Sequence, residues 1–233
     1  MNRVLIITGA SRGIGLATAH KFAAEGYRVF NVSRSPAGDG IEHIPVDLTA
    51  ADWVERSGAA LRNACAGADQ VALIHNAGAI LKDSVRDFDA AAFQRVLAIN
   101  VTAPAQLTAL LLPQMKAGSS VIFVGSTLSE QAVANSLAYV TSKHAVVGVM
   151  RATCQDLAGS GIHTACVCPG FTDTEMLRAH VGHSGEILDA LATAVTFGRL
   201  IEPQEIAETL WFAARNPVLN GAVIHANLGQ IQR

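Results

Sequence analysis

Two side chains with complementary acid–base chemistry lie four positions apart in the chain. Tyr139 and Lys143 begin a stretch with a helical pattern, and residues four apart share one face of a helix. The phenol and the ammonium can therefore converge on one site, where a nearby cation stabilises the ionised phenol. Such a tyrosine can give or take a proton near neutral pH, although a half-buried core tyrosine has the same sequence signature.

A cluster of glycines near the start of the chain indicates a different kind of site. It lies between an apolar, β-branched run and a helical pattern. Glycines at such a junction let the backbone approach a pyrophosphate, and the helix N-terminus offers N–H groups and positive partial charge to the phosphates. A tight turn without a ligand is the alternative. Because of the strand-to-helix context, we expect a dinucleotide to be bound by Gly9, Ser11, Arg12, Gly13, Ile14 and Gly15.

The residues after the second apolar run bear on the choice of nucleotide. The run ends Asn31-Val32-Ser33-Arg34, and the next acidic residue is Asp39. NAD sites usually place an acid just after this strand, to accept a hydrogen bond from the ribose 2′-hydroxyl. Arginines at positions 12 and 34 could instead grip a 2′-phosphate, with the Ser33 hydroxyl as a further donor. Two solvated arginines are the alternative, and we expect NADP(H) rather than NAD(H).

Polar segments also follow three later apolar runs. The carboxyl ends of parallel strands face the ligand crevice, so Asp47 is placed to accept a hydrogen bond from an adenine amino group. Asn76 is as compatible with a tie between neighbouring strands as with a ligand contact. Ser126 ends the fifth run, where its hydroxyl could bond a substrate oxygen. We expect these segments to contribute the cofactor contacts Asp47, Leu48, Asn76, Ala77 and Gly78.

Apolar runs and helical patterns alternate along the chain and must position these groups. The expected strands are Arg3–Ile7, Arg28–Val32, His43–Val46, Val71–His75, Ser120–Val124, His163–Val167 and Ala222–His225. The expected helical stretches are Gly13–Glu25, Ala51–Ala66, Phe88–Met115, Ser136–Leu157, Glu175–Ala194 and Pro203–Ala214. Several runs are continuously apolar, as in strands buried on both faces. The alternation predicts an α/β fold, a doubly wound, seven-stranded parallel sheet with helices on both faces (Rossmann-like), in one domain over residues 1–233.

The composition limits the classes of function to consider. The 233 residues are 50% hydrophobic and 15% charged, with a formal net charge of −2. Such a chain has no electrostatic footprint for nucleic acid or for an anionic membrane. We expect no membrane span, because no continuous apolar run reaches about 18 residues. We expect a cytoplasmic location, because the start of the chain lacks a signal-peptide pattern.

The four cysteines match no zinc-ligand spacing, and we expect reduced thiols. Cys166 and Cys168 flank Val167 in an expected strand, which places both side chains on one face. Ordinary buried thiols and a metal pair are both compatible with this placement. We predict no metal site.

Taken in order, these motifs resemble the short-chain dehydrogenase/reductase family in its compact single-domain branch. The resemblance covers nearly the whole chain. The glycine cluster is similar to the family's cofactor motif, and Asn76-Ala77-Gly78 is similar to its Asn-Ala-Gly motif. His75 stands where a first asparagine is commoner in the family.

The resemblance also assigns catalytic groups. Ser126 precedes Tyr139 by 13 positions, which is the family's usual separation, and Lys143 completes its Tyr-x-x-x-Lys pair. Asn100 falls at the position of the family's catalytic asparagine. The resemblance implies that Tyr139 is the general acid/base, that Ser126 orients the substrate oxygen, and that Asn100 fixes a water of a proton relay. Lys143 would stabilise the ionised tyrosine and, with Tyr139, contact the nicotinamide ribose.

Two C-terminal segments extend the resemblance. Pro169-Gly170 with Thr172 and Thr174 is similar to the stretch that contacts the nicotinamide carboxamide, and residues 197–207 are similar to a Gly-Arg…Pro-x-Glu-Ile-Ala element. Residues 226–230 depart from the Asp-Gly-Gly that relatives often carry. The resemblance implies a homo-oligomer, a tetramer or a dimer. The long apolar helices would supply a second buried face from Ala103, Ala105, Leu107, Leu110, Leu111, Ala145, Val146 and Val149.

The implied activity is that of an NADP(H)-dependent carbonyl reductase or alcohol dehydrogenase, which transfers a hydride between nicotinamide and a carbonyl or hydroxyl carbon. A cofactor-binding regulator without chemistry is the rival, but it would be free to lose the tyrosine or the lysine. An epimerase or dehydratase of the longer branch would need a larger C-terminal domain. The substrate stays open among a ketone, a 3-oxoacyl thioester, a steroid and a pterin.

The segment 174–196 is the expected cover of the substrate. Gly182 and Gly185 are candidate hinges within it. The segment is mixed in polarity and contains Met176, Leu177, Arg178, His180, His183 and Leu188.

Overall fold

Seven parallel strands form the single sheet of this protein. The computed structural model describes residues 1–182 and 185–231. The strands are β1 (Arg3–Thr8), β2 (Arg28–Ser33), β3 (Glu42–Pro45), β4 (Gln70–His75), β5 (Ser120–Val124), β6 (His163–Pro169) and β7 (Ala222–Ala226). They lie in the order β3-β2-β1-β4-β5-β6-β7, and every neighbouring pair is parallel. The predicted seven-stranded, doubly wound, single-domain fold is confirmed.

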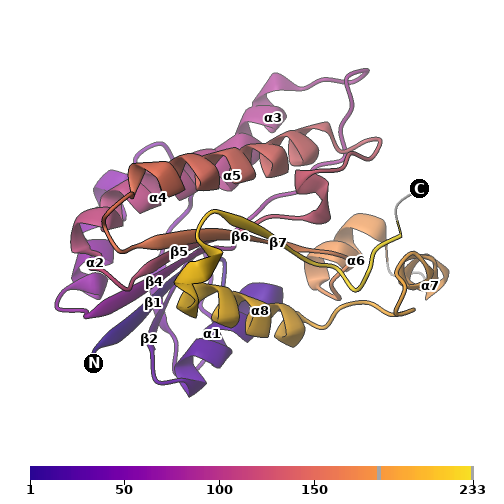
Figure 1. Cartoon of the computed structure of the whole chain (residues 1–233). Coiled ribbons are helices and arrows are strands. Elements are labelled where there is room, and N and C mark those ends of the chain that lie inside the picture. Colours follow the sequence, from indigo (N-terminus) through magenta and orange to yellow (C-terminus); the bar gives the residue numbers. More distant parts are fainter. Residues whose placement is uncertain (183–184, 232–233) are drawn as a thin grey trace.

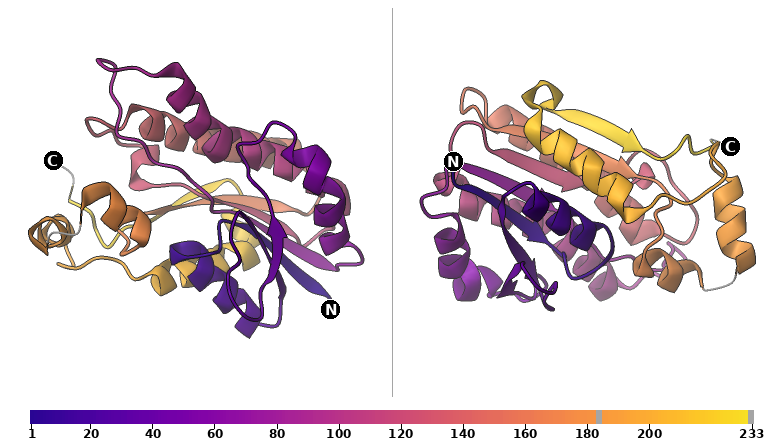
Figure 2. Two further views of the ribbon diagram at one scale, coloured as in Figure 1. Left: turned by 180° about the vertical axis from the view of Figure 1, so that it is seen from behind. Right: turned by 90° about the horizontal axis from the view of Figure 1, so that it is seen from below.

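Helices cover both faces of the sheet (Figures 1 and 2). One layer contains α2, α4 and α5, and the opposite layer contains α1 and α8, which lie against each other. The bounds are α1 (Gly13–Ala24), α2 (Trp53–Cys65), α3 (Ala90–Leu97), α4 (Ala103–Leu111), α5 (Leu137–Asp156), α6 (Glu175–Val181), α7 (Gly185–Thr193) and α8 (Pro203–Arg215). In Figure 1, α6 and α7 lie beyond the end of the sheet opposite the N-terminus.

Burial on both faces explains why the strands lack polar alternation. Successive side chains of a strand point to opposite faces, so Val4 and Ile6 of β1 enter one core while Leu5 and Ile7 enter the other. All five residues of β5 are buried. A strand with a core on each side must therefore be apolar throughout.

The helical stretch expected at Phe88–Met115 starts later and is interrupted. Asp89 caps α3 by accepting hydrogen bonds from the N–H groups of Ala91 and Ala92, so the helix begins at Ala90. A π-helical turn, η1 (Ala98–Thr102), separates α3 from α4. Pro104 gives the physical reason, because a proline has no N–H to donate to the carbonyl four residues earlier, that of Asn100.

The stretch expected at Glu175–Ala194 is two helices. Between α6 and α7 stands Gly182 with φ of 98°, a left-handed conformation that cannot continue a helix. His183, one of the residues expected in the cover of the substrate, lies outside the described residues, as does Ser184.

One stretch, 90–114, is long and apolar enough to cross a membrane by length and composition, with a mean hydropathy of 1.5 in its most apolar window. This corrects the expectation that none would be. In the structure the stretch passes through α3 and α4 beside α2 and α5, and 39% of that window is buried. Helices that pack in the core of a soluble α/β protein are also long and apolar, because they bury most of their surface. The finding is therefore weak evidence for a membrane span.

His75 fixes the end of β4 to the helix layer. Its ring centroid lies 4.8 Å from that of Phe123, and a hydrogen bond of 2.8 Å joins its Nε2 to the hydroxyl of Thr108 in α4. Burial lowers the pKa of this imidazole from 6.5 to about 3. The folded protein therefore holds a neutral histidine where the family commonly has asparagine.

This histidine predicts a pH dependence of stability. An unfolded chain protonates His75 below about pH 6.5, whereas the folded ring takes a proton only near pH 3, so the free energy of unfolding falls as the pH is lowered through this window. One such proton contributes a slope of about 1.4 kcal/mol per pH unit. In chemical denaturation, His75→Asn should therefore show a smaller loss of stability on acidification than the unchanged protein.

Thr108→Val is the matched control, because it removes the hydrogen bond and keeps the titrating ring. It should lower stability by about 1–3 kcal/mol with little change in the pH slope. Equal slopes for His75→Asn and the unchanged protein would show that another group carries the dependence.

Candidate active site

The residues expected to do chemistry gather at the carboxyl edge of the sheet. The glycine cluster follows β1, Ser33 ends β2, the segment from Asn76 follows β4, and Ser126 follows β5. Pro169 is the last residue of β6. The strand order reverses between β1 and β4, which is the position where open α/β sheets form a ligand crevice.

The glycine loop has the shape and the free backbone groups that a pyrophosphate needs. Gly9 and Gly13 have φ of 70° and 55°, and a Cβ at Gly15 would overlap the Gly9 carbonyl. Arg12 is the N-cap of α1, and within the described residues no side chain caps this helix and no acid stands in its first turn. Its N–H groups and positive dipole end therefore remain available to phosphate oxygens. Ser11 lies in the same turn, while Ile14 packs at the edge of the core.

Hydrogen bonds tie the glycine loop to its neighbours. Asn76 Nδ2 donates to the carbonyls of Thr8 and Gly9, at 3.0 Å each, and the Thr8 hydroxyl accepts from the N–H groups of Asn76 and Ala77. Asn31 Oδ1 accepts from the Ala10 N–H at 2.9 Å. Of the two interpretations of Asn76, the structure shows the tie between strands. Thr8 opens the motif that resembles the family's cofactor loop, but its role as an anchor, like that of Asn31, gave no sequence signal, since a buried Thr or Asn in a strand is ambiguous.

Side chains of opposite charge follow β2 and β3, Arg34 after the first and Asp47 after the second. Arg34 is exposed, and the Ser33 hydroxyl donates to the Ser35 carbonyl at 2.6 Å. Asp47 accepts from the hydroxyl and the N–H of Thr49, and these bonds, with the positive charge of Arg34 nearby, lower the pKa of its carboxyl group. Leu48 packs against the core rather than standing free. Asp47 is thus an ionised acceptor beside Arg34, with Oδ1 already engaged.

Both polar atoms of the Asn100 side chain are hydrogen-bonded within the protein. Its Oδ1 accepts from the Ala79 N–H at 2.8 Å, and its Nδ2 donates to the Ala79 carbonyl and to the Ser142 hydroxyl, both at 2.9 Å. The residue is 2% exposed and lies in the π-helical turn. What it can offer a water is its backbone carbonyl, whose α-helical donor is missing at Pro104.

Lys143 is buried in front of β5. The side chain is 5% exposed, Nζ donates to the Val124 carbonyl at 2.8 Å, and Nζ lies 5.5 Å from the ring centroid of Tyr139. A Cβ on Gly78 would lie 3.9 Å from this Nζ and 3.6 Å from Asn100 Oδ1. The lysine therefore stands between the tyrosine and the segment after β4.

Ser126 stands on a short capped turn that packs against α5. Its Oγ accepts from the Leu128 N–H at 3.1 Å and its N–H donates to the Ser129 hydroxyl. A hydroxyl that accepts one bond still has its own proton to give, so Ser126 can donate to a substrate oxygen.

The two neighbouring thiols lie directly beneath this turn. Sγ atoms of Cys166 and Cys168 are 3.8 Å apart, and a Cβ on Gly125 would lie within 2.8 Å of both. The hydrogen bond to Cys168 and burial together raise the pKa of the Cys166 thiol, which stays protonated. In the described part of the chain no three His, Cys, Asp or Glu side chains gather as a metal site. The thiols are free and fill core space.

The segment after β6 is held by its own threonines and by the start of α8. The Thr172 hydroxyl donates to the Gly170 carbonyl, and Thr174 Oγ1 accepts from the Leu177 N–H to cap α6. A Cβ on Gly13 would lie 3.3 Å from the Thr174 methyl group, so this segment touches the glycine loop. In the structure both threonines are thus engaged internally, and their expected contact with a nicotinamide carboxamide stays a prediction.

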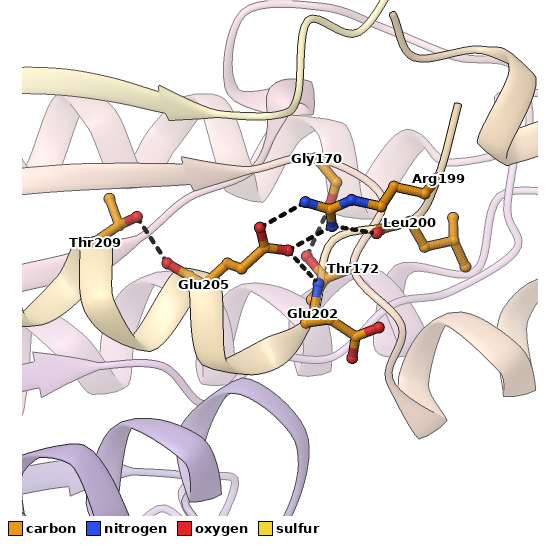
Figure 3. Close-up of polar contacts among 7 residues, drawn as sticks. All are labelled: Gly170, Thr172, Arg199, Leu200, Glu202, Glu205 and Thr209. Carbon is orange, nitrogen blue, oxygen red and sulfur yellow. Dashed lines mark hydrogen bonds and ion pairs between the residues drawn. The ribbon is translucent and has the colours of Figure 1, made fainter. Parts of the chain in front are cut away.

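Figure 3 shows what the element at 197–207 does. Arg199 donates through two nitrogens to the Glu205 carboxylate, at 2.7 and 2.8 Å, and Glu205 accepts from the Glu202 N–H to cap α8. These bonds lower the pKa of Glu205 to about 2. An isolated parallel β-bridge between Thr172 and Ile201 joins this element to the segment after β6.

A cavity of 670 Å³ opens between the segment after β4 and α6. Its charged lining is mainly cationic, and the positive charge of Lys82 and burial act together on His180 to lower the pKa of that imidazole, burial being the larger cause. Arg178 is already paired with Asp173. The lining residues are Arg12, Ala79, Ile80, Lys82, Glu175, Met176, Arg178, Ala179 and His180.

Comparison with known proteins places the chain among its relatives. The family described as short chain dehydrogenase matches residues 3–183. The 3-oxoacyl-(acyl-carrier-protein) reductase MabA of Mycobacterium tuberculosis is 30% identical over 235 residues, covering 98% of this chain and 93% of that protein. The cis-4-hydroxycyclohexanecarboxylate dehydrogenase of Sinomonas cyclohexanicum is 33% identical, covering 91% of this chain and 89% of that protein.

Solved structures agree with the sequence relatives. The aldohexose dehydrogenase of Thermoplasma acidophilum, in its ligand-free form, superposes with a TM-score of 0.90 at 26% identity, over 98% of this chain and 93% of that one. The match of sequence and fold thus extends over the sheet, the glycine loop and the helix that bears Tyr139. The chain belongs to the short-chain dehydrogenase/reductase family and is an oxidoreductase acting on carbonyl or alcohol groups, a family that uses a nicotinamide cofactor.

Proposed function

We propose that this protein is an NADP(H)-dependent carbonyl reductase or alcohol dehydrogenase in which Tyr139 is the general acid/base. The observation that carries the proposal is the buried Lys143 ammonium, held by the Val124 carbonyl and 5.5 Å from the Tyr139 ring. A cation generally favours the ionised form of a phenol close to it, and the place of this ammonium is fixed by β5. A binding protein without chemistry could use the lysine for the cofactor or the fold, but it would have no need of a tyrosine hydroxyl beside it.

The residues divide the work as follows. A bound nicotinamide supplies or accepts the hydride. Tyr139 gives a proton to the carbonyl oxygen during reduction and takes it back during oxidation. Ser126 donates a hydrogen bond to the same oxygen, where negative charge develops. Lys143 holds the nicotinamide ribose hydroxyls, and the backbone carbonyl of Asn100 holds a water that returns the proton to solvent.

The substrate that we propose is a carbonyl compound with an acidic group. Lys82, from the segment after β4, brings a positive charge to the cavity, and His180 of α6 adds an imidazole that can donate a hydrogen bond. Glu175 is the one acid among the described residues of the lining. The name of one relative points to such a compound, the hydroxy acid of the cis-4-hydroxycyclohexanecarboxylate dehydrogenase. A panel of ketones, 3-oxoacyl thioesters, steroids and pterins, followed by loss of NADPH absorbance, tests this choice.

The free thiols fit a reducing compartment, and we propose the cytoplasm, with no membrane or nucleic-acid partner.

Removing the Tyr139 hydroxyl tests the proposed acid/base. Tyr139→Phe should retain the fold and NADPH binding while turnover falls by at least about 100-fold, the usual contribution of a positioned acid/base group. Steady-state reduction of the best carbonyl of the panel, alongside NADPH titration, measures both. Retained turnover in a folded Tyr139→Phe protein would mean that another group supplies the proton.

Exchanging the charge at Arg34 tests the choice of cofactor. NADPH should bind more tightly than NADH by about 1–3 kcal/mol, the range for charge-assisted hydrogen bonds to a phosphate. Arg34→Asp should erase or reverse this preference, because its carboxylate repels the 2′-phosphate and accepts from a 2′-hydroxyl. Arg62→Asp, the same change on the exposed part of α2, should leave the preference intact. Equal dissociation constants in the unchanged protein would contradict the proposal.

The assembly that we propose is a homo-oligomer, a dimer or a tetramer. Of the second apolar face expected from the sequence, Ala103, Leu107, Leu111 and Val146 are wrong, because they lie in the chain's own core. Ala105 is exposed, and Leu110, Ala145 and Val149 are half-buried, so these remain for a partner. Light scattering should show a dimer or tetramer at micromolar concentration, and Ala105→Arg should shift it toward smaller species. Ala60→Arg on α2 is the control, and a monomeric unchanged protein would refute the proposal.

A further inference from the structure

The catalytic helix α5 has no cap of its own. Ser136 is its N-cap residue, with φ of −145°, and its side chain makes no capping hydrogen bond in the part of the chain that the structure describes. The first N–H groups of a helix have no partner within it and must find one elsewhere. Here they lie one turn or less from Tyr139, which is the third residue of α5.

Asp83, 55 positions earlier, takes the place of the missing cap. Both oxygens of its carboxylate accept from the Ala138 N–H, at 3.1 and 3.0 Å. Its backbone adds two contacts, from the Asp83 N–H to the Asn135 carbonyl at 3.3 Å and from the Leu137 N–H to the Asp83 carbonyl at 3.4 Å. The carboxylate also meets the positive end of the helix dipole. Ala138 is the residue before Tyr139, so the cap acts at the catalytic turn.

Asp83 is the far end of a segment that is anchored along its length. The segment 76–83, which we call the strap, is tied to β1 by Asn76 and to the π-helical turn by the two bonds between Ala79 and Asn100. Asn100 also bonds Ser142 of α5. The strap therefore joins the strand that carries the glycine loop to the first turn of α5.

The loop that leads into α5 along the chain restrains the start of this helix less than the strap does. The residues 132–135 are exposed, including Val133 at 53%, and Asn135 adopts φ of 58°, a left-handed turn conformation that asparagine accepts more readily than most residues with a side chain. The Asn135 carbonyl is itself held by the Asp83 N–H. Without Asp83, this loop would have to orient the catalytic turn alone.

We propose that Asp83 is a positioning residue, which sets the orientation of Tyr139 by fixing the first turn of α5 against the cofactor edge of the sheet. The proposal rests on the proposed function of Tyr139 as the acid/base. Asp83 touches neither substrate nor cofactor in this role. It acts through the Ala138 N–H, and its removal should slow proton transfer without weakening the binding of either ligand.

The test compares Asp83→Ala with a matched loss of a helix cap. Asp89 caps α3 through the same kind of carboxylate-to-N–H bonds and lies in no part of the proposed machinery, so Asp89→Ala controls for stability alone. Asp83→Asn keeps an acceptor oxygen for the Ala138 N–H and removes the charge. The readouts are kcat and KM for acetoacetyl-coenzyme A or the best carbonyl of the panel, NADPH titration, and hydrogen exchange of the Leu137 and Ala138 amides.

We expect Asp83→Ala to lower kcat by about 10- to 100-fold, the scale on which a misplaced catalytic group loses rate. KM and NADPH affinity should stay within about twofold, exchange at Ala138 should accelerate, and Asp83→Asn should recover most of the loss. Asp89→Ala should keep kcat within about twofold.

Unchanged kcat in Asp83→Ala, or a loss no larger than that of Asp89→Ala, overturns the proposal. If Asp83→Ala does not fold, a normal kcat together with accelerated Ala138 exchange in Asp83→Asn overturns it equally. Tyr139→Phe in the same assay keeps the two proposals apart. Turnover retained in Tyr139→Phe refutes the acid/base function, whereas loss in Tyr139→Phe with normal turnover in Asp83→Ala refutes only the role of Asp83.

Discussion

This site depends on one constraint, which is that the backbone carbonyls at the ends of the parallel strands need hydrogen-bond donors. A carbonyl past the last ladder bond needs a donor if it is out of reach of water. Thr8 and Gly9 receive theirs from Asn76, and Val124 receives its from Lys143. The side chains expected to act on ligands are thus also the donors that close the edge of the sheet. Their positions are fixed by the fold itself, because moving one would leave a buried oxygen unpaired.

The residues of the site are therefore of two kinds. Some side chains are fully engaged in holding the fold, and others keep a hydroxyl proton free. The Asn100 side chain holds the strap and α5 and keeps little free capacity, so the relay that we propose uses its backbone carbonyl, in a turn that Pro104 bars from regular α-helix. Tyr139 and Ser126 keep a hydroxyl proton that can face a substrate. Replacing Asn100 should therefore disturb structure and catalysis together, whereas Tyr139 can lose its hydroxyl at little cost to the fold.

The sequence predicted every strand to within two residues at either end. For the inner strands the reason is burial on both faces, which requires a continuous apolar run, whereas β3 and β7 are only partly buried. It failed where one residue breaks a periodic pattern. Pro104 unwinds the long helix at Asn100, and Gly182 with its positive φ divides the later one, although apolar spacing continues across both. Local pattern also could not find Asp83, whose partner lies 55 positions away, or Asn31, which anchors the glycine loop across β2. Such contacts follow from strand order, which periodicity alone does not fix.

Two helices that begin at the site lack a cap of their own, and the difference between them follows from what each must do. The start of α1 carries glycines and Arg12, and its open N–H groups suit an anionic ligand that binds and leaves. The start of α5 bears Tyr139, and the acid/base role that we propose for it requires its hydroxyl to meet a substrate atom within a narrow range of geometry. A permanent carboxylate from Asp83 serves that end, because the bond it makes does not depend on what is bound. The same unsatisfied helix terminus is thus left open for a ligand in one case and closed by the chain in the other.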